Sequence, residues 1–104
     1  GRPMKNLVLI VPESVYQSVT DQLRALSVSG FTVAHVEGHG AHTAQDTFLS
    51  ARDRVVGFVP RVRIDVVVEQ ETVDVVLAAL AGGGSELTGH GAWWVTPVER
   101  SGGF

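Results

Sequence analysis

The pattern of polar and apolar positions predicts that the chain begins with a strand followed by a helix. The segment 5–11 is almost entirely apolar and ends at Pro12, which is typical of a strand buried on both faces. A capping-box pattern at 14–17 predicts a helix start, and the Ser-Gly pair at 29–30 predicts its end. The expected buried stripe of this helix comprises Val15, Val19, Leu23 and Leu26.

Three further strands and a second helix are predicted downstream. The segments 31–37 and 93–98 are rich in β-branched and aromatic residues, and Pro97 places the latter at a sheet edge or strand end. The segment 61–69 alternates cleanly, with Arg61, Arg63 and Asp65 opposite a face of Val62, Ile64, Val66 and Val68. Acidic residues at 69–71 favour a helix start there, and the glycines at 82–84 a stop. The expected buried stripe of this helix comprises Val73, Val76, Leu77 and Leu80.

The order of these segments, β-α-β-β-α-β, is that of the ferredoxin-like α+β fold. Such a sheet carries its helices on one face, so the other face is expected to be polar. Residues 7–11 are instead apolar at every position, and Val67 interrupts the polar side of its strand. We therefore expect another copy of the chain to cover this face, which makes the protein an oligomer.

The longest irregular segment, residues 38–60, separates two of the predicted strands. Loops longer than ~12–15 residues are uncommon in compact domains and are usually functional or disordered. Gly38-His39-Gly40 opens the segment, and its glycines suit tight turns that direct backbone N–H groups at an anion. Four of the eight Lys and Arg residues follow within or just after it: Arg52, Arg54, Arg61 and Arg63. The first hypothesis is an anionic ligand at the base of this loop.

Composition indicates one soluble globular domain. The chain has 104 residues, of which 44% are hydrophobic and 18% charged. The net charge of -3 argues against a nucleic-acid partner, and the absence of cysteine excludes disulfides and thiolate chemistry and fits a cytosolic protein. No apolar run approaches the ~18–20 residues of a membrane span. Residues 1–3 precede Met4 and are expected to be extraneous to a single domain at 4–104.

Three blocks of residues resemble the PII signalling proteins and their PII-like relatives. Residues 30–40 (GFTVAHVEGHG) resemble the second family strand that leads into the T-loop. Residues 58–65 (FVPRVRID) resemble the FLPKVKIE block on the far side of that loop. Residues 88–99 (TGHGAWWVTPVE) resemble the TG…GDGKIFV…PVE block, where the B-loop lies. The blocks occur in the family order and span nearly the whole chain.

The resemblance implies a homotrimer that binds adenine nucleotide in each cleft between subunits, with a T-loop at 38–57 and a B-loop at 85–92. By position, Ile10, Thr32 and Val67 would line the adenosine, and backbone N–H groups of four glycines would face the phosphates. Arg61 takes the place of a family lysine, and Arg100 would close the site. The implied nucleotide-binding residues are Ile10, Thr32, Gly38, His39, Gly40, Arg61, Val67, Thr88, Gly89, His90, Gly91 and Arg100.

Departures from the family pattern indicate which ligands the chain takes. Ala92 stands where the B-loop normally has lysine, which favours ADP or AMP over ATP. At Gly40, Ala41 and His42 the residues that ligate Mg²⁺ and 2-oxoglutarate in nitrogen-sensing members are missing, and the loop has no tyrosine for uridylylation. The chain thus resembles the carbon-related, carboxysome-associated branch. Its implied second ligand is bicarbonate, held by the backbone at Gly40, Ala41 and His42 and by Arg61.

The function implied is that of a non-enzymatic sensor. The T-loop would signal to a protein partner, such as a membrane transporter or a carbon-fixation component, in the cytoplasm or at a carboxysome. No nucleic-acid partner and no obligatory metal are expected. The sequence has neither a nucleophile elbow nor an HExxH motif that would indicate catalysis.

Two alternative functions stay open. His35, His39 and His42 lie within eight residues, so their imidazoles would suit Zn²⁺, Cu²⁺ or Ni²⁺. We expect no acidic or thiolate ligand beside them, which disfavours the metal site. The other alternative is an enzyme, because ferredoxin-like domains carry many activities.

The tryptophan pair and the loop arginines have simpler interpretations. One ring of Trp93-Trp94 is expected in the core and the other at a subunit interface, with base stacking as the less favoured alternative. Arg52 and Arg54 are expected to be solvated, or else to contact a partner through the ordered loop.

Overall fold

The computed structural model describes residues 2–39, 59–82, 87 and 90–104. Its elements, in chain order, are β1 (Met4–Pro12), the 3₁₀ turn η1 (Glu13–Val15), α1 (Tyr16–Ala25), β2 (Thr32–Gly38), β3 (Val59–Glu69), α3 (Gln70–Gly82) and β4 (Ala92–Val98). All four predicted strands and both predicted helices are present. The predicted T-loop beyond His39 and half of the predicted B-loop, residues 85, 86, 88 and 89, lie outside the described residues.

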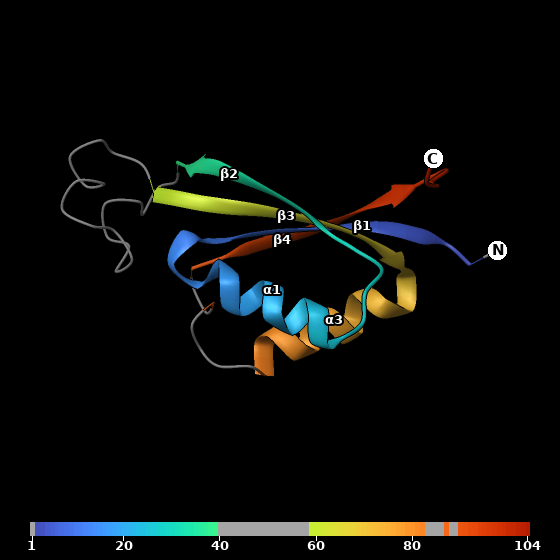
Figure 1. The fold of residues 1–104 in the computed structure, drawn as a ribbon, viewed down its shortest axis with the longest axis horizontal. Coiled ribbons are helices and arrows are strands. Elements are labelled where there is room, and N and C mark those ends of the chain that lie inside the picture. Colours follow the sequence, from blue (N-terminus) through green and yellow to red (C-terminus); the bar gives the residue numbers. More distant parts are fainter. Residues whose placement is uncertain (1, 40–58, 83–86, 88–89) are drawn as a thin grey trace.

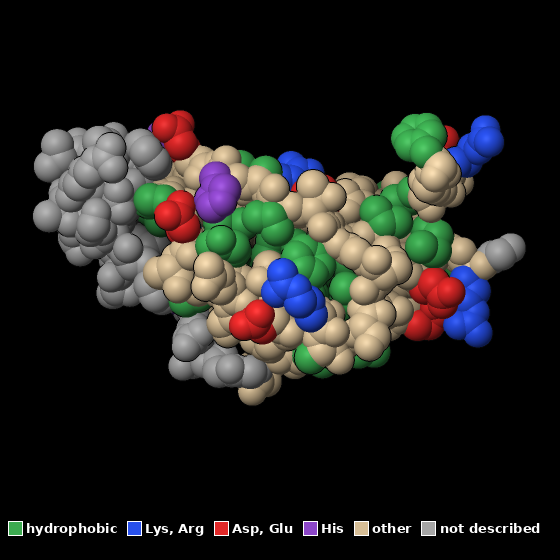
Figure 2. Space-filling view, in the orientation of Figure 1, with side chains coloured by type: hydrophobic (Ala, Val, Ile, Leu, Met, Phe, Trp, Pro, Cys, Tyr) green, Lys and Arg blue, Asp and Glu red, His purple; other side chains and the backbone are tan. Residues whose placement is uncertain are grey.

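The four strands form one antiparallel sheet in the order β2-β3-β1-β4. Both helices lie on the same side of this sheet (Figure 1), so the predicted ferredoxin-like α+β fold is confirmed. β4, which contains Pro97, is an edge strand as its sequence predicted. β2 is the other edge, and residues 32–35 on it are exposed. In the space-filling view, hydrophobic side chains reach the surface between the sheet and the helices (Figure 2).

The hydrophobic core fills the space between the sheet and the two helices. The alternation predicted for β3 is observed, because Val62, Ile64 and Val66 have no exposed surface while Arg61 and Arg63 point to the other face. The core cluster comprises Leu7, Leu9, Val11, Val19, Leu23, Val62, Ile64, Val66, Val68, Val73, Val76 and Leu80. α3 therefore buries its predicted stripe, with Leu77 packed at the margin, and α1 buries Val19 and Leu23, with Leu26 at the margin. Val15, the first residue predicted for the stripe of the first helix, instead lies in η1 and does not belong to this cluster.

The face of the sheet opposite the helices, hereafter the helix-free face, is only partly apolar. Val8 alternates with the core residues of β1 and therefore points to this face, yet it is 1% exposed. Trp94 and Asp65 flank it on the two neighbouring strands. Val67 and Trp94 are 36% and 42% exposed on the same side. A central strand buried on both faces is what the sequence of β1 predicted.

The start and end of α1 differ from the prediction. The 3₁₀ turn η1 precedes it, and neither element has a side-chain cap, so the predicted capping box at 14–17 is wrong. Pro12, in extended conformation, instead leads directly from β1 into the turn. The helix ends at Ala25 because Ser27 adopts a left-handed φ of 57° and donates its N–H to the Arg24 carbonyl at 3.1 Å. The chain therefore leaves the helix before the Ser-Gly pair at 29–30.

α3 follows its prediction at both ends. The N–H of Gln70, at its start, donates to the Pro3 carbonyl at 3.1 Å, and the Arg2 guanidinium lies 3.2 Å from the Glu69 carboxylate. Residues 2 and 3 therefore contact the beginning of this helix. Among the residues that the structure describes, no helix has the length and apolar character needed to cross a membrane.

Replacing Ser27 by glycine should stabilise the protein. A side chain in the left-handed region costs roughly 1–2 kcal/mol, which glycine relieves, although its more flexible unfolded chain offsets part of the gain. We expect Ser27→Gly to raise the free energy of unfolding in urea by about 0.5–1 kcal/mol. Ser29→Gly, an exposed neighbour without a left-handed φ, is the control and should give no gain. Equal destabilisation of both variants would contradict the strain at Ser27.

Candidate functional site

The base of the predicted T-loop and the beginning of β4 meet at one end of the sheet. Pairing of β2 with β3 places Gly38 opposite Val59, and pairing of β1 with β3 places Pro12 opposite Arg61. Ile10, two residues earlier on β1, pairs with Ala92 at the start of β4. Four strand ends thus converge here, and we call this the loop end of the sheet.

Arg61 connects the two loops at the loop end. Its Nη1 donates a hydrogen bond to the backbone carbonyl of His90, in the described part of the B-loop. Its side chain passes beside Gly38, where an added Cβ would stand 2.7 Å from Arg61 Cγ and 3.0 Å from Nε. Gly38 is therefore required for close approach of the arginine, since any side chain at this position would displace it.

Gly91 allows the turn before β4 to lie against β1. An added Cβ would stand 3.1 Å from the Ile10 carbonyl oxygen, a backbone atom that has little room to move. The N–H of His90 donates to the Leu87 carbonyl at 3.0 Å and closes the turn. Ile10, Gly38, Arg61, His90 and Gly91, all predicted nucleotide-binding residues, are thereby brought together.

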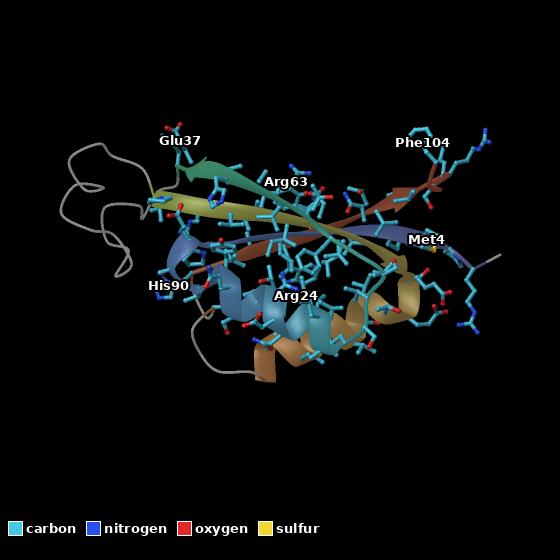
Figure 3. The ribbon with its side chains drawn as sticks, viewed as in Figure 1. Met4, Arg24, Glu37, Arg63, His90 and Phe104 are labelled. Atoms are coloured by element: carbon cyan, nitrogen blue, oxygen red, sulfur yellow. The ribbon has the colours of Figure 1, made fainter. Side chains whose placement is uncertain are left out.

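Three other predicted residues lie elsewhere in the same chain. Val67 follows Arg61 by six residues along β3, which is about 20 Å, and Thr32 pairs with Asp65 close to it. Arg100 follows β4 at the end opposite His90, because Val98 pairs with Met4 (Figure 3). Within one chain these residues do not join the loop end. Gly40, Ala41, His42, Thr88 and Gly89 lie outside the described residues.

His35 and His39 each lie beside a carboxylate. His35 Nδ1 is 3.5 Å from Glu13 Oε2, and its ring meets Tyr16 edge-on at 5.7 Å. His39 Nε2 is 3.6 Å from Glu37 Oε2. The expectation that no acidic group adjoins these histidines is therefore wrong. Within residues 2–39, 59–82, 87 and 90–104, no three potential ligands form a metal-binding group; His42, the third histidine of the predicted site, is outside these ranges.

A polar cluster on the helix-free face joins β1, β3 and β4. Arg63 donates from Nε and Nη2 to the two carboxylate oxygens of Asp65, at 2.8 and 3.1 Å, and Asn6 Nδ2 donates to Asp65 Oδ2 at 3.0 Å. The guanidinium also lies over the Trp94 ring, 5.7 Å from its centre. The alternation of β3 put Arg63 and Asp65 on one face but did not predict their partners on other strands.

This bidentate contact shifts the titration of both partners. The hydrogen bonds from Arg63 lower the pKa of Asp65 below its ordinary value, the bond from Asn6 adds to the effect, and partial burial opposes it. The same contact raises the pKa of Arg63. The cluster is therefore a fixed ion pair at neutral pH, in the middle of the face expected to contact another copy.

The two tryptophans point to opposite faces of β4. Trp94 shares the helix-free face with Arg63, while Trp93 pairs with Leu9 on the helix side. Their exposed fractions are 42% and 57%. The expectation that one ring belongs to the core is therefore wrong in the single chain, because both rings keep a large exposed surface.

Comparison with known proteins identifies the family to which the chain belongs. The sequence profile of the family described as "Nitrogen regulatory protein P-II" matches residues 4–102. The chain belongs to the P-II family. The P-II protein of Rhodobacter capsulatus is 27% identical over 99 residues, which cover 94% of this chain and 88% of that protein. That of Azospirillum brasilense is 29% identical over 98 residues, covering 93% and 88%. The resemblance found in the sequence is confirmed.

Solved structures support the P-II fold. A DUF3240 family protein from Shewanella baltica OS155 superimposes with a TM-score of 0.74 at 18% identity, covering 97% of this chain and 96% of that one. CPII, a nitrogen regulatory PII-like protein from Thiomonas intermedia K12 that was solved bound to ADP, AMP and bicarbonate, gives 0.71 at 21% identity, covering 98% and 97%. At these identities the likeness shows a shared fold.

The Asp65 cluster should make the stability of this P-II family member depend on acidity. A lowered folded-state pKa means that the carboxylate stabilises the fold above the unfolded pKa of about 3.9, and that this contribution is lost as pH falls through the folded value. The free energy of unfolding of the wild type should therefore exceed that of Asp65→Asn by a constant amount near neutral pH, and this difference should shrink below about pH 4. Urea unfolding across pH measures it, with Asp74→Asn on α3 as the matched removal of a distant carboxylate. A difference in free energy of unfolding that grows as the pH falls would contradict the lowered pKa of Asp65.

Proposed function

We propose that this chain is a non-enzymatic P-II-like sensor whose copies form a homotrimer and bind ADP or AMP between subunits. The main support is the division of the implied site residues into two groups. Arg61, His90 and Gly91 lie at the loop end, whereas Val67 lies about 20 Å along β3 and Thr32, opposite Asp65, about 13 Å along the strands. A second copy placed with its Thr32 and Val67 against the loop end would complete a nucleotide site.

The helix-free face supports assembly. Val67 and Trp94 are exposed there beside the Arg63–Asp65 pair, and no helix of the described chain lies on that side (Figure 1). Apolar sheet surface of this kind is stabilised by burial against another protein. A further copy supplies the same apolar surface, and cyclic symmetry closes the assembly without leaving the face open.

The chemistry of the loop end favours a phosphate. An arginine forms charge-assisted, bidentate hydrogen bonds with phosphate oxygens, and a glycine turn lets backbone N–H groups approach them. The contact of Arg61 with the His90 carbonyl positions its side chain before a ligand arrives, which reduces the ordering cost of binding. Ala92 adds no cation for a terminal phosphate, which favours ADP or AMP over ATP.

Signalling would use the T-loop at 38–57. We infer that bicarbonate, held by the backbone at 40–42 and by Arg61, acts as second effector, and CPII supports this choice because it shares the fold and was solved with that anion and two adenine nucleotides. Ligand would select one loop conformation that a protein partner recognises. A membrane transporter or a carbon-fixation component, in the cytoplasm or at a carboxysome, is the proposed partner.

Removing the Arg61 guanidinium should weaken nucleotide binding. We expect Arg61→Ala to reduce the affinity for ADP by about 1–3 kcal/mol, the usual loss for a hydrogen bond to a charged group. Calorimetry with AMP, ADP and ATP, with and without bicarbonate, measures this loss and the ligand preference. Arg24→Ala, an exposed arginine of α1 paired with Asp21, is the control and should bind ADP as the wild type does. Unchanged affinity for ADP in Arg61→Ala would show that Arg61 is not part of the site. Failure of the wild type to bind AMP, ADP or ATP would overturn the proposed function.

The wild-type protein should have a solution mass three times the 11.1 kDa of the chain. Val67→Asp introduces a charge on the helix-free face, where its desolvation in an interface is unfavourable, and should shift the mass toward one chain. Val75→Asp makes the same change on α3, where Val75 is 53% exposed, and should leave the mass unchanged. Light scattering after size-exclusion chromatography measures each mass. A monomeric wild type would contradict the intersubunit site.

A further inference from the structure

We draw no further inference here: the strongest candidate, the outer edge of β2, where Val33 is 36% exposed and the ring of His35 meets Tyr16, carries none because nothing among the described residues shows what covers it.

Discussion

The register between β1 and β3 is the constraint on which the rest of the structure depends. It places Leu7 opposite Val66 and Leu9 opposite Ile64 in the core, and Pro12 opposite Arg61 at the loop end. A slip of one residue would turn every core side chain of one strand to the helix-free face. The alternation of β3 excludes such a slip, because Arg63 and Asp65 would then replace Ile64 and Val66 in the core. The register of β1 and β3 therefore also sets the positions of the residues at the loop end.

Two arginines on one face of β3 show that the neighbouring strands determine the role of a side chain. Arg63 lies in the middle of the sheet, where it meets Asp65 and Trp94 and becomes part of a fixed ion pair. Arg61, two residues earlier, meets a glycine on β2 and the carbonyl of His90. The two side chains are chemically identical. Their surroundings make the first a structural group and the second a candidate ligand-binding group.

Much of the fold followed from the sequence because its determinants are local. The period-two alternation of β3, the apolar run of β1 and most of the stripes of the helices depend on neighbouring residues. The glycine at 38, which lets Arg61 approach closely, was also predicted from its local sequence. Two of the errors concern contacts between distant residues. Glu13 reaches His35 across two elements, and the exposure of Trp93 depends on where α3 crosses the sheet. The left-handed Ser27 carried no sequence signal, since serine adopts that conformation rarely.

The two edges of the sheet are not equivalent. Proline at 97 removes a backbone donor from β4, so a foreign strand finds an interrupted ladder there. β2 contains no proline and offers a continuous row of peptide groups over its seven residues. When many copies are synthesised close together, edge-to-edge strand pairing between them would begin at β2. A single lysine or proline introduced on that strand would oppose this aggregation.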